Sequence, residues 1–108
     1  MRADLTYGAF AARVRDAFEV RRPDGPPMPL VLVEATTYGL ARAGDEPAQF
    51  SLIFQGPREP FLAQATYEVG HPMLGVFSLF LVPLALEHDG YRYEAVFNRI
   101  PDRAVSTP

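Results

Sequence analysis

The chain has 108 residues, no cysteine and a formal net charge of −3. This length fits a single domain with its own core, and the lack of cysteine excludes disulfides and thiolate-based zinc sites. Acidic residues are interleaved with the arginines, so the chain has no basic stripe of the kind that nucleic-acid binding needs.

The sequence predicts neither a secretory signal nor a membrane span. Residues 1–10 read MRADLTYGAF and contain no apolar core of a signal peptide. The longest apolar stretch, residues 72–86, is shorter than the roughly 20 residues of a spanning helix. We therefore expect cytoplasmic synthesis, with any route out of the cell being as part of a particle.

The first part of the chain predicts one short helix and two strands. Thr6 is placed to cap a helix from Tyr7 to about Ala12. Apolar and β-branched residues predict strands at 17–21 and 30–38. Between them, Pro23-Asp24-Gly25 predicts a turn, because Asp and Gly tolerate positive φ.

Residues 39–48, GLARAGDEPA, predict a polar loop that is mobile and tolerant of insertion. Four further strands are predicted at residues 50–55, 61–69, 75–86 and 91–98, each bounded by turn residues.

Six short strands with regular turn signals predict an all-β fold: a small antiparallel β-barrel or sandwich with one short N-terminal helix. We assign residues 1–100 to a single β domain and residues 101–108 to a flexible C-terminal tail.

The fifth predicted strand is apolar on both faces. Residues 75–86 read GVFSLFLVPLAL, in which Ser78 alone interrupts the two apolar sets, whereas a strand with one wet face alternates with polar residues. We predict that both faces are covered, by a second layer of this chain or by another chain. Pro83 predicts a bulge, edge or corner. The candidates for contact with the helix or with another subunit are Val31, Val33, Phe77, Leu79 and Leu81.

No pattern predicts a catalytic residue, a cofactor or a metal site. His71 has no second histidine at ligand spacing, and we interpret it as a loop residue that packs on the fold. Residues 87–89, Glu-His-Asp, are three potential metal ligands in a row, but successive side chains at a strand end point apart. We therefore interpret them as part of a tight turn and not as a metal site. An enzyme of this sequence would have to bring together Glu34, Glu68, Glu94 and His71.

The stretch from Phe50 to Asn98 resembles a family of small uncharacterised bacterial proteins. The matching positions, in order, are Phe54, Gly56-Pro57, Gln64, Thr66-Tyr67, His71-Pro72, Leu74-Gly75, Phe80 to Pro83 and Tyr93 to Asn98. Ala65 departs from the glycine expected between Gln64 and Thr66. The resemblance implies no catalytic residue. It implies a structural role instead, because members often accompany phage-tail-collar-like proteins.

Together these observations predict a non-enzymatic structural or interaction module. Its expected partners are copies of itself or a tail- or fibre-like protein, with no nucleic acid and no membrane. The alternative is a barrel that binds a small apolar ligand among Tyr67, Tyr93 and Phe97.

Overall fold

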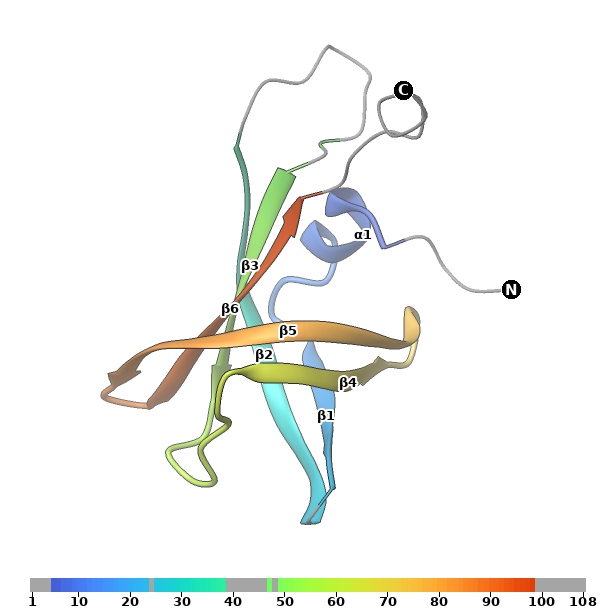
Figure 1. Cartoon of the computed structure of the whole chain (residues 1–108). Helices are drawn as coiled ribbons and strands as arrows, with labels where there is room; N and C mark the ends of the chain where they lie inside the picture. Colours follow the sequence, from blue (N-terminus) through green and yellow to red (C-terminus); the bar gives the residue numbers. More distant parts are fainter. Residues whose placement is uncertain (1–4, 24, 39–46, 48, 99–108) are drawn as a thin grey trace, which may run out of the picture.

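The structure is a computed structural model that describes residues 5–23, 25–38, 47 and 49–98. Its elements are α1 (Tyr7–Ala11), β1 (Ala17–Arg22), β2 (Gly25–Thr37), β3 (Gln49–Gly56), β4 (Ala65–His71), β5 (Gly75–Glu87) and β6 (Gly90–Asn98). The strands form one closed antiparallel barrel in the order β1-β2-β3-β6-β5-β4 (Figure 1). The predicted all-β class with one N-terminal helix is confirmed, and the barrel is the correct one of the two predicted forms.

Local signals in the sequence place most of these elements. The Thr6 side chain accepts a hydrogen bond from the Ala9 N–H at 3.1 Å and so caps α1 as predicted. The pairing of β5 with β6 shifts register directly after Pro83, which confirms the predicted bulge. The predicted loop at 39–48 falls almost wholly outside the described residues, and the predicted tail at 101–108 falls entirely outside them.

Two strand boundaries differ from the prediction. β2 begins at Gly25 rather than residue 30, because the prolines that follow it are compatible with extended backbone. β4 begins at Ala65 rather than Phe61. The preceding segment instead crosses the end of the barrel, where the buried Leu62 N–H donates to the Tyr93 hydroxyl at 3.0 Å.

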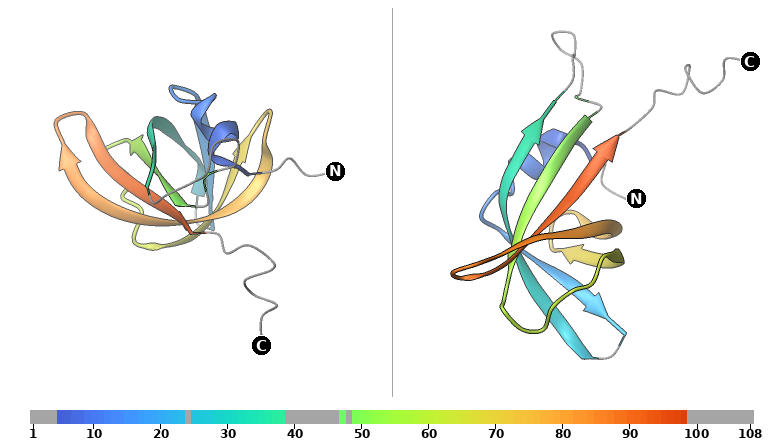
Figure 2. Two further views of the ribbon diagram at one scale, coloured as in Figure 1. Left: turned by 90° about the horizontal axis from the view of Figure 1, so that it is seen from above. Right: turned by 60° about the vertical axis from the view of Figure 1, so that its left-hand side comes forward.

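Two long strands of the barrel each pair with one neighbour along their first half and with another neighbour along their second half. β5, with 13 residues, pairs with β4 over residues 75–81 and with β6 over residues 82–87. β2, also 13 residues long, pairs with β1 over residues 25–31 and with β3 over residues 31–37. Each long strand therefore changes its partner midway, and β5 and β6 separate on the N-terminal side of Val82 (Figures 1 and 2).

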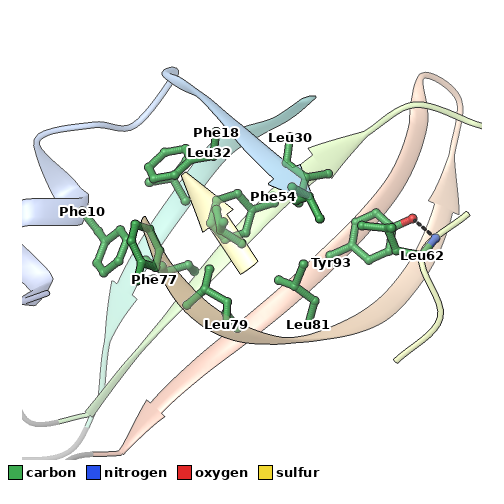
Figure 3. Packing of buried hydrophobic residues seen from close by; sticks show 14 of the residues in the cluster. Phe10, Phe18, Leu30, Leu32, Phe54, Leu62, Phe77, Leu79, Leu81 and Tyr93 are labelled. Atoms are coloured by element: carbon green, nitrogen blue, oxygen red, sulfur yellow. Dashed lines mark hydrogen bonds between the residues drawn. The ribbon is translucent and has the colours of Figure 1, made fainter. Parts of the chain in front are cut away.

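Helix α1 fills the interior where β5 and β6 part. Its Phe10 is fully buried, with ring centroids 5.8 Å from Phe77 of β5 and 5.4 Å from Phe97 of β6. Leu62 lies toward the other end, beside Tyr93 (Figure 3). The apolar core lies between Phe10 at one end and Leu62 at the other. Its largest fully buried side chains are Tyr93, Phe10, Phe18, Phe50, Phe54, Leu30, Leu32, Leu52, Leu81, Val20 and Val69.

Candidate functional site

Strand β5 has one covered face and one open face. Phe77, Leu79 and Leu81 point into the core (Figure 3). On the opposite face Val76 is 42% exposed and Phe80 is 51% exposed. Of the two predicted covers, a second layer of this chain is wrong for the outer face among the described residues, and cover by another chain stays a prediction. Six strands of this length enclose one interior, and no element among the described residues forms a layer outside β5.

The five predicted contact residues fall into different environments. Phe77 contacts the helix through Phe10, which was one of its two predicted roles. Leu79 and Leu81 are core residues of this chain, and their burial leaves no surface for another subunit. Val33 is half-buried beside the register shift in β2, and Val31 is exposed on the outside of that strand.

The exposed apolar residues around β5 form a patch on the outside of the barrel. It comprises the exposed Val76 and Phe80 and the half-buried Val82 of β5, together with Val96 of β6, which is 56% exposed. Val82 and Glu94 form the last pair before β5 and β6 part, and Phe80 and Val96 each lie two residues beyond that pair, on the outer face of the two diverging strands. We call these four residues the outer β5 patch.

Polar residues border the patch on the neighbouring strands. On β4, Thr66 lies opposite Phe80 and Glu68 lies opposite Ser78. The Glu68 carboxylate lies 3.5 Å from the Arg21 guanidinium of β1. An apolar centre with a polar border is the composition typical of a protein–protein contact.

His71 is engaged on both ring nitrogens. Its Nδ1 accepts from the Met73 N–H at 3.0 Å, so the proton lies on Nε2, which donates to the Asp16 carboxylate at 2.8 Å. The ring is buried and its centroid lies 4.6 Å from that of Phe18. The interpretation as a packed residue agrees with this geometry, although His71 ends β4 rather than lying in a loop. Neither nitrogen is free to take a proton from a substrate.

The three glutamates do not converge on His71. Glu34 of β2 and Glu94 of β6 lie opposite Ile53 from its two sides, so a whole strand separates them, about 10 Å at the usual strand spacing. Glu68 lies in the ion pair on β4. Within the described residues, no group of three His, Cys, Asp or Glu side chains is arranged to hold a metal ion.

The residues of the predicted ligand cavity pack against other groups. Tyr93 is fully buried in the core, and the Phe97 ring stacks on Phe50 with centroids 4.5 Å apart. The Tyr67 hydroxyl donates to the Ala63 carbonyl at 2.6 Å. This packing does not favour the ligand-binding alternative, which stays a prediction.

Open depressions on the outside of the barrel include two that lie against β1 and β4. The larger, about 630 Å³, lies over β1 and the turn between β4 and β5. The smaller, about 480 Å³, lies between the end of β1 and the start of β4. The larger reaches Val76 and so adjoins the outer β5 patch. The outer surface near β5 is therefore uneven as well as apolar.

The sequence of this chain matches a known protein family. Residues 5–97 match the model of a family described as a domain of unknown function, DUF6916. The chain belongs to the DUF6916 family. This match confirms the predicted uncharacterised family, and it covers the N-terminal helix and residues 50–97 of the stretch that carries the resemblance. No curated protein and no solved structure matches this DUF6916 domain. No helix in the described part of the chain has the length and apolar character to cross a membrane.

Proposed function

We propose that this DUF6916 domain is a non-enzymatic interaction module that assembles with further copies of itself through the outer β5 patch. The observation that supports the proposal is the exposure of Phe80 and Val96, two apolar side chains on the outside of the barrel that are each more than half exposed. Apolar surface left in contact with water is stabilised when a partner covers it, by roughly 25 cal/mol for each Å².

The chemistry of the site supports association over catalysis. The buried histidine holds two internal hydrogen bonds. The acidic residues that an enzyme would use lie apart on the outside of the barrel. The residues of the outer β5 patch carry no acid, base or nucleophile of their own. An apolar patch with a polar border matches recognition of another protein surface.

A tail-like or fibre assembly is the biological setting that we propose for this module. The resemblance of residues 50–98 implies that setting, since related proteins often accompany phage-tail-collar-like proteins. A structural subunit of such an assembly needs surfaces that contact other subunits, and the outer β5 patch is an apolar surface that fits one such contact.

The oligomeric state of matched variants tests this proposal. Phe80→Ser removes the largest side chain of the patch, and Leu86→Ser is its control, because Leu86 is 49% exposed on the same strand. Leu86 lies opposite Tyr91, which shares the inward face of β6 with Tyr93, so its side chain points away from the patch.

Sedimentation velocity over a hundredfold range of concentration is the measurement. We expect the wild type and Leu86→Ser to associate alike and Phe80→Ser to stay monomeric. Equal association of all three proteins would contradict a role for the patch.

A further inference from the structure

We propose that two copies of the chain join by antiparallel pairing of the free edge of β5, at residues 75–81, about a two-fold axis through Ser78. This inference rests on the proposed self-association and names its geometry. The contact would extend the sheet of each barrel into the other. Val76 of each copy would lie against Phe80 of the other, so these apolar side chains of the outer β5 patch would cover each other in part.

As far as the structure describes the chain, one edge of β5 has no strand partner over residues 75–81. Over residues 75–81, β5 pairs with β4 on one side. On its other side the pairing with β6 begins only at Val82. The N–H and C=O groups of successive residues alternate between the two edges of a strand, so half of those in this stretch face the opening between β5 and β6. In the described part of the chain no further backbone hydrogen bond to this edge is found.

The second step is that helix α1 covers the interior and not the edge. Phe10 enters between Phe77 and Phe97 by ring contacts alone. The figures show α1 on the concave side of β5, with the strand curving past it (Figures 1 and 2). The core is therefore closed, while the backbone groups at the rim of β5 still lack strand partners.

The third step is that this edge has none of the usual protection against pairing. Charged residues, proline or a bulge commonly prevent an exposed edge strand from pairing with another chain. Residues 75–81 read GVFSLFL and contain no charge and no proline. The register shift lies beyond them, after Pro83. A strand with these properties pairs readily with another strand edge.

The fourth step is that the edge is complementary to itself. With the two-fold axis at Ser78, Val76 of one copy lies opposite Phe80 of the second copy, and the two Ser78 residues lie opposite each other. Aromatic and β-branched residues form favourable cross-strand pairs, and no like charges meet. Such a contact is isologous, which is the usual form of a homodimer interface. A second copy is therefore the occupant that fits.

A single cysteine tests this geometry. The chain has no cysteine, so Ser78→Cys reports on this position alone. Residues directly opposite in antiparallel strands have Cα atoms about 4.5 to 5.5 Å apart, which is within the range of a disulfide. We expect Ser78→Cys to form a covalent dimer under mild oxidation, at concentrations where the wild type self-associates.

Thr66→Cys is the matched control. Thr66 is also exposed and lies beside β5, opposite Phe80. In the proposed dimer it is at least three strand spacings from its copy, roughly 14 Å, which is too far for a disulfide. If Ser78→Cys cross-links no faster than Thr66→Cys, the edge pairing is refuted.

A pair of charge variants provides a second, reversible test. Ser78→Glu and Ser78→Lys are each combined with Glu68→Gln, because Glu68 lies opposite Ser78 within the same chain. Each double variant places like charges opposite each other at the two-fold axis, so each alone should dissociate about two- to fivefold more readily. The equimolar mixture should recover the wild-type affinity. Self-association of either variant at wild-type strength would overturn the proposed pairing.

The outcomes separate this inference from the proposed function. If the wild type assembles and Phe80→Ser does not, but position 78 neither cross-links nor responds to charge, then the patch is the interface and the edge is not. If the wild type is monomeric at every concentration, both proposals fail.

Discussion

Replacing Phe77 and Phe80 by alanine, one at a time, tests which face of β5 is the core face. Phe77 is 6% exposed and its ring meets Phe10 and Phe18 edge to face, with centroids 5.8 and 6.4 Å away. Loss of a buried phenylalanine costs about 3–5 kcal/mol through transfer and cavity terms. We expect Phe77→Ala to fall within this range, a large fraction of the stability of a small domain.

Phe80→Ala removes a ring of the same size that is already half in water. Full burial of a phenylalanine contributes about 1.5–3 kcal/mol, so half of it corresponds to about 1 kcal/mol. No cavity forms, since the ring lies on the outside of the barrel.

Urea unfolding at a concentration where the protein is monomeric measures both values. The two variants should differ by at least about 2 kcal/mol in free energy of unfolding. Equal losses, or a larger loss for Phe80→Ala, would refute the assignment of the inner and outer faces.

Three further predictions follow from contacts inside the barrel. Gly90 has a φ of +136°, and a Cβ there would collide with the Gly56 carbonyl oxygen. Gly90→Ala should therefore lower the free energy of unfolding by about 1–3 kcal/mol. An unchanged thermal unfolding transition would contradict this close approach. Tyr93→Phe removes the acceptor of the Leu62 N–H and should cost about 1–3 kcal/mol. Burial raises the pKa of Tyr93, so this hydroxyl ionises in the unfolded chain first as the pH rises above about 10. The wild type should therefore lose stability above that pH, and Tyr93→Phe should lack this part of the loss. Parallel dependence of the free energy of unfolding on pH in the two proteins would refute this expectation. His71→Ala leaves a backbone N–H and a carboxylate without their partner and should cost about 2–4 kcal/mol in urea unfolding, and a loss below about 0.5 kcal/mol would show that this pair is not structural.

Local patterns were sufficient to predict the elements of the fold. The capping threonine, the turn residues and the alternating strands each act through their neighbours in sequence, so one helix and six strands followed from the sequence alone. Pro83 signalled the register shift because it cannot donate to a strand ladder.

The choice of faces could not be predicted in the same way. In β5 both alternating sets are apolar, so the pattern does not say which set lies inside. The decision comes from the register with β4, where Val69 lies opposite Phe77 and the polar Thr66 lies opposite Phe80. Register is a long-range property, and the sequence alone does not fix the strand order.

The boundary of β4 and the partner of His71 have the same origin. Residues 61–64 continue an alternating pattern, yet the Tyr93 hydroxyl holds that segment across the barrel end. His71 bonds to Asp16 across 55 residues of sequence, which no local spacing reveals. Both features depend on tertiary contacts, which explains why sequence reasoning missed them.

The molar mass of the wild-type protein in solution tests the central claim most directly. Sedimentation equilibrium over rising concentration should give at least twice the 12.0 kDa of one chain, and Phe80→Ser should remain at the mass of one chain. A wild-type protein that keeps the mass of a single chain at the highest concentration would contradict the claim that the outer β5 patch joins copies of this domain.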